Sequence, residues 1–371
     1  MNLHCPDCSQ VFSVASGRPG TQVPCPRCRH PVTLTRVHPP LGAWPDIVGH
    51  VSALIARAAG VRRPAGFSLR QTFSQVLSHR SGEEIERCLA VGGPDTTPDI
   101  RAVCCEWPRP WMFFRALVLA LAMYGVFVAA WEQFGNRNLI PGLILVGSFA
   151  VPLSTLVLFF EFNVRRNVSL YQVCRLVMVG GVLAMVLSLF MYRLSAAFPI
   201  QWLGPSLAGV VEEPAKLLAL GMVVNDRRYR YTLNGLLLGA AVGAGFAAFE
   251  SAGYAFRVGL LDGSLAMRGV LVSRGLLSPF SHVVWTGMSA AALWRVKGGR
   301  RFEPWMLGDA RFMRVFAAAV LLHMIWDSGL QLPLYGLNVL LGAVAWVIVL
   351  GLIEEGLSEL RVERQAAGMP R

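Results

Sequence analysis

Seven ionisable side chains interrupt apolar stretches of this chain that are long enough to cross a bilayer: Glu212, Glu213, Lys216, Glu250, His282, His323 and Asp327. A charge near the bilayer centre costs roughly 2.5–3.5 kcal/mol on insertion scales, so such groups normally pair with one another or serve a function. Carboxylates and imidazoles on four successive segments suit metal-assisted or general-base hydrolysis better than ion conduction. The pattern predicts a membrane enzyme.

The first motif is VVEEPAK, from Val210 to Lys216. Glu212 and Lys216 are four residues apart, so we expect a buried ion pair between them. Successive helical residues point about 100° apart, so Glu213 is expected to face elsewhere. Only Lys216 and Lys297 are lysine among the 34 basic residues, which argues against a chance ammonium here. The alternative is an ion pair that only fixes helix packing.

Glu250 belongs to a segment in which Gly235, Gly239 and Gly243 recur every four residues. Such a stripe of small residues lets another helix backbone approach closely. Glu250 lies two turns after Gly243 on the same face, so it is predicted to point into the bundle. Phe246 precedes it by four residues, giving FxxxE. The alternative is a packing stripe with a hydrogen-bonded glutamate.

Two histidines complete the set. His282 stands in PFSH, and His323 is followed by Asp327 one helical turn later. A carboxylate at that spacing can orient an imidazole or stabilise its charged form. Counted from the nearer end of each segment at ~1.5 Å per residue, the carboxylates and imidazoles can share one layer of the membrane.

The elements that position these groups are predicted membrane helices. The chain is 54% hydrophobic and 15% charged, with a mean hydropathy of +0.50, whereas a soluble domain has about 25% charged residues. Its net charge of +12 comes from arginines in short loops, which indicates the positive-inside rule and argues against a nucleic-acid partner. The loop arginines predict cytoplasmic termini in a multi-pass protein of the inner cell membrane. The expected eight spans are 111–132, 139–161, 173–195, 201–224, 232–256, 275–295, 312–330 and 334–353, with a loop before the sixth that contains Arg257, Arg268 and Arg274.

Two CxxC pairs occupy the first 36 residues: Cys5, Cys8, Cys25 and Cys28. Four thiolates on two tight turns can close a tetrahedral zinc shell, and so small a segment needs the metal to fold. We therefore predict a structural zinc ribbon, whose few basic residues favour docking of a cytosolic protein.

The fold class expected is an all-α polytopic membrane protein of about eight transmembrane helices, preceded by a small β zinc ribbon. The predicted domains are the ribbon (1–36), a cytosolic linker with amphipathic helices (37–107), a transmembrane enzyme domain (108–356) and a cytosolic tail (357–371). In the linker, Ile47 to Ala59 and Leu69 to Leu77 have helical spacing, and Ser81 is a candidate N-cap.

The ordered motifs EExxK, FxxxE, PxxH and HxxxD resemble those of PrsW-type intramembrane proteases, within the CAAX-protease and bacteriocin-processing group. The resemblance covers roughly residues 110–356. Tyr254 fits the family pattern, whereas Ser251 stands where asparagine is expected.

The resemblance implies cleavage of membrane-anchored proteins, such as anti-sigma factors, in the lipid bilayer. Glu212 or Glu213 would activate a water as general base, and Lys216 and Phe246 would support the site. His282, His323 and Glu250 would either hold a catalytic zinc or stabilise the oxyanion, and Asp327 would orient His323. Both the metal-dependent and the metal-free mechanism stay open.

Two other functions compete with proteolysis. A proton-coupled transporter or channel would also need buried carboxylates and histidines, but transporters often show two related halves, and no such repeat is evident. A non-catalytic membrane scaffold would use the ribbon to dock partners.

Overall fold

The computed structural model describes residues 2–4, 11–13, 22–26, 31–33, 47–62, 64, 67–93 and 95–368. The chain divides into two compact units, Met1–His50 and Val51–Arg371. It is mostly helical.

The first unit contains two antiparallel hairpins, in which β1 pairs with β2 and β3 with β4. Val23 lies opposite Val32 in the second hairpin, and the side chains of Val32 and Cys25 are buried. Cys5, Cys8 and Cys28 lie outside the described residues, so the zinc ribbon stays a prediction. The strands are Asn2–His4 (β1), Val11–Ser13 (β2), Gln22–Pro24 (β3) and Pro31–Thr33 (β4).

Short helices precede the long ones. Ser81 caps the third of them as predicted, because its Oγ accepts from the backbone N–H of Glu84 while the Glu84 carboxylate accepts from that of Ser81. The second is shorter than its pattern suggested and ends at Thr72. The elements are α1 (Ile47–Ala59), α2 (Leu69–Thr72), α3 (Gly82–Leu89) and a 3-10 turn at Ile100–Ala102.

The bundle itself consists of long helices joined by short turns. The helices are α4 (Met112–Phe134), α5 (Ile140–Phe162), α6 (Leu170–Arg175), a π-helical turn (Leu176–Gly180), α7 (Gly181–Ser195), α8 (Leu207–Val223), α9 (Thr232–Leu261), α10 (Gly263–Leu277), α11 (His282–Lys297), α12 (Ala310–Trp326) and α13 (Gly336–Gly368). The 3-10 turns between them are Arg137–Leu139, Gln201–Ser206, Ser278–Phe280, Pro304–Gly308 and Pro333–Tyr335.

Five helical runs in the described part of the chain are long and apolar enough to cross a membrane: Met112–Phe134, Arg137–Phe162, Leu170–Ser195, Thr232–Leu261 and Pro333–Gly368. The protein is therefore a multi-pass membrane protein, and the count of eight spans stays a prediction. Three expected spans are represented by α8, α11 and α12, which have only 16 or 17 residues. At 1.5 Å per residue they are about 25 Å long, shorter than a ~30 Å hydrocarbon layer.

The segment before the sixth expected span is not a loop. Residues 263–277 form α10, which packs against α9 and α5. Gly263 makes the tight turn between α9 and α10 possible because its φ is +85°. The expected span 275–295 is broken at Ser278–Phe280, so α11 begins only at His282. A break of this kind leaves no mark in average hydropathy.

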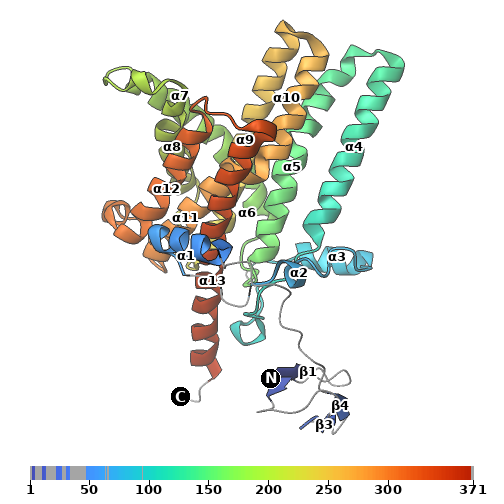
Figure 1. The fold of residues 1–371 in the computed structure, drawn as a ribbon, viewed down its shortest axis with the longest axis vertical. Helices are drawn as coiled ribbons and strands as arrows, with labels where there is room; N and C mark the ends of the chain where they lie inside the picture. Colours follow the sequence, from blue (N-terminus) through green and yellow to red (C-terminus); the bar gives the residue numbers. More distant parts are fainter. Residues whose placement is uncertain are drawn as a thin grey trace. The chain divides into compact units, whose positions relative to one another are not determined.

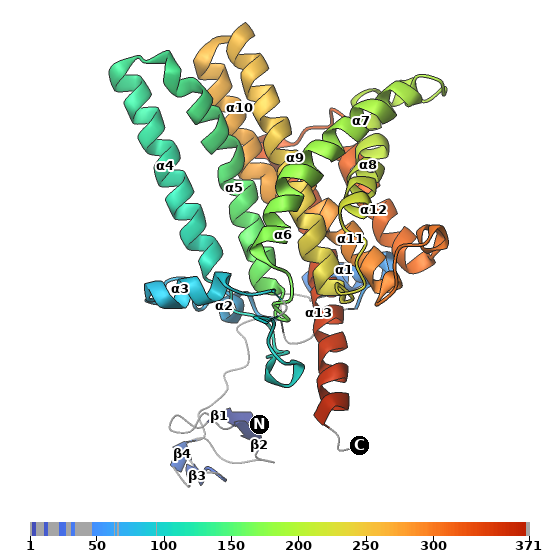
Figure 2. The same cartoon turned by 180° about the vertical axis from the view of Figure 1, so that it is seen from behind.

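α9 lies at the centre of the second unit, and α4 at its edge, in both views (Figures 1 and 2). The α9 glycine stripe packs against α11: a Cβ on Gly239 would lie 2.5 Å from the carbonyl oxygen of Thr286. Close approach of the two backbones is what the small residues predicted, and it holds the helices that carry Glu250 and His282 together.

Candidate functional site

The ionisable groups predicted for the site converge from four helices. α8 carries both glutamates and the lysine, α9 carries Glu250, and α11 begins at His282. His323 lies on α12, and Asp327 is the residue that ends this helix. Burial is nearly complete for most of them, since Glu213, Lys216 and His323 are 0–1% exposed.

Lys216 is at the middle of the cluster. Its Nζ lies 2.8 Å from Oε1 of Glu213 and 3.4 Å from Oε2 of Glu212. The expectation that Glu213 faces elsewhere is therefore wrong. The 100° rule describes where side chains leave the helix, whereas these long side chains reach the same ammonium at spacings of three and four residues.

His282 bridges this lysine and the glutamate of α9. Its Nδ1 lies 2.9 Å from Nζ of Lys216, and its Nε2 lies 3.1 Å from Oε2 of Glu250. An ammonium can only donate, so Nδ1 accepts and Nε2–H donates to the carboxylate. Phe246 packs beside both, with its ring 4.2 Å from the lysine Nζ.

His323 is flanked by carboxylates on both ring nitrogens. Its Nδ1 lies 2.9 Å from Oε1 of Glu213, and its Nε2 lies 3.2 Å from Oδ2 of Asp327. Trp285 stacks on the imidazole with ring centroids 4.6 Å apart. These three neighbours fix the ring plane, which is the orienting effect that the HxxxD spacing suggested.

Arg274 is a member of the cluster that the motifs did not include. The guanidinium donates to the Glu250 carboxylate and, at 2.9 Å, to Oγ of Ser251. It also lies over the ring of Tyr254, 4.6 Å from the centroid. The sequence placed Arg274 in a loop, and its one usable signal was an arginine within an apolar, helix-compatible run.

Tyr192 of α7 is the second missed neighbour. Its hydroxyl donates to Oε1 of Glu212 at 3.4 Å. The tyrosine lies outside the four motif-bearing segments, and no spacing rule connects it to α8.

A cavity of about 270 Å³ opens beside the cluster. Glu212 lines this cavity, whereas Glu213 and His323 lie behind it. The Oε2 atom of Glu212 is buried and has no hydrogen-bond partner among the described residues. The charged and hydroxyl-bearing side chains that line the cavity are Tyr192, Glu212, Glu250, Ser251, Tyr254, Arg274, Ser278, Ser281, His282 and Asp327.

The cluster contains a possible metal site. Within the described ranges, one set of three ligand atoms lies within 4.8 Å of one another, from Glu212, His282 and His323. Two imidazoles and one carboxylate are a common ligand set of catalytic zinc. The Glu212 Oε2 atom fits that role, because it makes no hydrogen bond among the described residues and its ion pair with Lys216 is 3.4 Å long. The geometry favours Glu212 over the expected Glu250 as the carboxylate ligand, because Glu250 is engaged by Arg274 and His282.

A family model for PrsW family intramembrane metalloproteases matches residues 168–353, just over half of the chain. The match includes every residue of the cluster and leaves out α1 to α5. No curated protein and no solved structure matches the chain. The convergence of the motif-bearing helices and the family match agree: the chain belongs to the PrsW family of intramembrane metalloproteases.

Proposed function

We propose that this protease cleaves membrane-anchored proteins, of the anti-sigma-factor type, at the cavity between α8, α9 and α11. The supporting observation is the position of Glu212, which lines the cavity and lies next to two histidines and a lysine, with an Oε2 atom that makes an ion pair with Lys216 but no hydrogen bond among the described residues. A peptide bond that enters this cavity meets carboxylate, imidazole and guanidinium groups in a site largely shielded from bulk water.

In this proposal Glu212 takes the proton from the attacking water as general base. Tyr192 holds one of its oxygens by a hydrogen bond, and Lys216 supplies a nearby positive charge. His282 lines the same cavity, and its Nε2–H, which Glu250 accepts in the resting site, would turn to the developing oxyanion. Glu212 would then pass the proton taken from water to the leaving amine. Asp327 and Glu213 act through His323, which they orient from both sides.

Glu212, His282 and His323 are the residues that would hold a metal ion. When bound there, zinc supplies a Lewis acid next to the scissile carbonyl. Glu250 would then be the cavity-lining carboxylate left to take the proton, with Arg274 and His282 fixing its position.

The remaining parts of the chain keep their predicted roles in the proposal. We place the protein in the inner cell membrane with both termini cytoplasmic, because the arginine-rich loops alternate with loops of low charge. The divisions 1–36, 37–107, 108–356 and 357–371 stand as proposed domains. The zinc ribbon is proposed to dock a cytosolic partner.

The test is cleavage in proteoliposomes that contain the full chain and solubilised host membrane proteins, followed by sequencing of new peptide termini. Glu212→Gln should lower the cleavage rate about 10²–10⁴-fold, as expected for loss of a general base. Glu86→Gln, at an exposed position of α3, is the matched control and should cleave like the wild type. Unchanged cleavage by Glu212→Gln would refute the assignment.

The metal content separates the two zinc predictions. Elemental analysis of the purified chain should find two zinc ions per molecule. The His323→Ala variant should lose the intramembrane zinc ion and all cleavage. The Cys25→Ser variant should lose the zinc ion of the ribbon and keep cleavage. A single zinc that only Cys25→Ser removes would contradict the intramembrane metal site.

A further inference from the structure

A second cavity, of about 380 Å³, lies at the end of the bundle where the α5–α6 and α8–α9 loops meet. We call it the arginine pocket. Residues from the linker before α4 complete its wall. The residues that line it are Gly93, Thr97, Arg165, Asn167, Arg227, Arg228, Arg230 and Tyr231.

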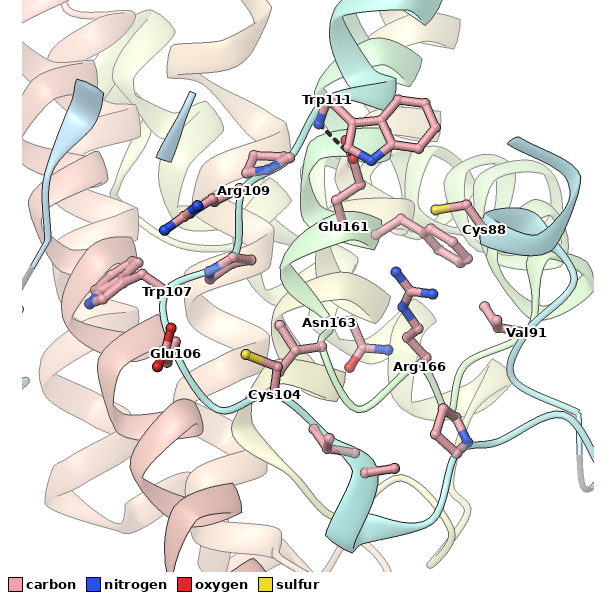
Figure 3. A pocket seen from close by; sticks show the side chains of 17 residues that line it. Cys88, Val91, Cys104, Glu106, Trp107, Arg109, Trp111, Glu161, Asn163 and Arg166 are labelled. Atoms are coloured by element: carbon pink, nitrogen blue, oxygen red, sulfur yellow. Dashed lines mark hydrogen bonds between the residues drawn. The ribbon is translucent and has the colours of Figure 1, made fainter. Parts of the chain in front are cut away.

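The lining charges of the arginine pocket are all positive. Four guanidiniums share it, and none of the described residues that line it is acidic. A neighbouring cavity of about 540 Å³ is different, because Arg109 and Arg166 are accompanied there by Glu106 and Glu161 (Figure 3). Like charges that share one cavity repel each other, so the arginine pocket favours an anionic ligand where its neighbour does not.

The four arginines are only partly neutralised by the protein. Arg165 donates to the carbonyl of Pro98, which is neutral. Arg230 pairs with Glu363, and Arg228 has Asp226 at 3.9 Å, but neither acid lines the pocket. For Arg227, the described part of the chain offers no hydrogen bond or ion pair. At least one guanidinium is therefore available to a ligand.

The walls of the pocket are held in place by buried polar contacts. Beneath it, the Asn234 side chain on the first turn of α9 exchanges hydrogen bonds with Asn167 and also donates to Asn163. On the other side, Lys297 donates to the backbone carbonyls of Asp226 and Tyr229 at 3.0 and 2.9 Å. Because these contacts already order the loops, a ligand that binds here loses little free energy to loop ordering.

We propose that the arginine pocket binds the phosphate group of an anionic phospholipid. Planar guanidiniums match phosphate oxygens in a two-bond geometry. The pocket is lined by loops that adjoin candidate membrane spans, which end at Phe162 and begin at Leu170 and Thr232. Basic pockets at the ends of membrane helices attract anionic lipids. Leu170 and Tyr171 follow Asn167 closely and are 42% and 74% exposed, as side chains that contact the lipid interface should be.

The site would be coupled to the active centre through the chain itself. The α8–α9 loop, which supplies three of the four arginines, joins the helix of Glu212 to the helix of Glu250. A lipid headgroup in the pocket would restrain the ends of both helices. The binding proposal does not depend on the proteolytic one.

The experiment titrates the full chain, in neutral detergent, with dioctanoyl phosphatidylglycerol, dioctanoyl phosphatidylcholine and inorganic phosphate, and follows binding by native mass spectrometry. Phosphatidylglycerol should bind, and phosphatidylcholine should not. Arg227→Gln should weaken phosphatidylglycerol binding about fivefold, and Arg227→Gln with Arg228→Gln more than tenfold, since each arginine near a lipid surface contributes about 1 kcal/mol. Arg137→Gln, an exposed arginine in the α4–α5 turn, is the charge-matched control and should leave binding unchanged.

The single variant is expected to fold normally, because Arg227 is exposed and makes no hydrogen bond or ion pair with the described residues. Equal binding of both lipids would overturn the proposal, and so would an unchanged affinity in both arginine variants. Inorganic phosphate that binds as tightly as phosphatidylglycerol would assign the pocket to a soluble phosphate and overturn the lipid assignment.

Discussion

α9 and α4 are both long apolar helices, yet they occupy opposite environments. The apolar core of α9 has a mean hydropathy of 1.6, and 94% of it is buried inside the protein. The corresponding part of α4 has a mean hydropathy of 2.1, and only 6% of it is buried. The more hydrophobic helix is thus the exposed one. Lipid and protein interior are both apolar, so hydropathy does not separate them, but residue size does: α9 is rich in glycine and alanine, and α4 presents large side chains.

α10 lies between these two environments and makes an ion pair with each helix. Arg274 contacts Glu250 of α9, and Arg268 contacts Glu132 near the end of α4. The inner pair adjoins the cavity, and the outer one joins residues at the rim, where Glu132 is 57% exposed. We therefore expect Arg274 to matter for catalysis and Arg268 to matter only slightly for stability, although both are arginines of α10.

The largest difference in cleavage activity is expected between the variants Arg274→Gln and Arg268→Gln. Loss of Arg274 leaves Glu250 without its guanidinium and should lower kcat about 10–100-fold with little change in KM, because the residue positions a site carboxylate. Loss of Arg268 should cost at most about 1 kcal/mol of stability, as exposed ion pairs do, and leave kcat unchanged.

Chemical rescue distinguishes positioning from folding. Added guanidinium should restore part of the cleavage by an Arg274→Ala variant, which it would not do if the helix had merely unfolded. Equal kcat losses in the two glutamine variants would mean that the inner and outer pairs do not differ, contrary to the comparison.

The glycines of α9 and α4 differ in the space around them. A Cβ at Gly239 would lie 2.5 Å from the Thr286 carbonyl oxygen, whereas one at Gly125 of α4 would meet nothing within 4 Å. Gly239→Ala should destabilise the protein by about 1–3 kcal/mol through overpacking. Gly125→Ala should stabilise it by up to about 1 kcal/mol, because alanine favours the helix. Thermal unfolding in detergent measures both, and a shift of the same sign in both variants would contradict the difference in packing.

The sequence predicted this inner packing well but not all of the site. The glycine spacing on α9 and the order of the four motifs were enough to bring the helices of Glu212, Glu250, His282 and His323 together, because each rule concerns one helix face. Arg274 and Tyr192 were missed because they reach the cluster from helices without a motif. Contacts between elements distant in sequence depend on how helices are placed, which single-helix periodicity does not encode.

The orientation of Glu213 shows a second limit. The 100° rule gives only the direction in which its side chain leaves the helix, whereas the final contact depends on the rotamers of a long side chain and on where Lys216 and His323 lie. Similarly, α10 was expected to be a loop between two spans that contains arginines, although both Arg268 and Arg274 are paired with glutamates of other helices. A charge that has a partner does not mark a loop.

The smallest difference in stability is expected at the N-termini of α9 and α4, each of which is capped by a glutamate from another helix. Glu359 of α13 accepts from the backbone N–H of Thr232 at 2.9 Å and from its hydroxyl at 2.5 Å, at the start of α9. Glu161 of α5 accepts from three backbone N–H groups at the start of α4. Such carboxylates satisfy donors that the helix leaves unpaired, and losing one typically costs about 1 kcal/mol.

Glu359→Ala should therefore lower the global free energy of unfolding by about 1–2 kcal/mol, because α9 packs against most of the bundle and cannot loosen alone. Glu161→Ala should have less effect on global unfolding, because α4 contacts mainly α5 and can open locally. Hydrogen exchange distinguishes the two: protection should fall throughout the bundle in the first variant and only along α4 in the second. Loss of protection across α9 in Glu161→Ala would mean that the outer helix is as integral to the fold as the inner one.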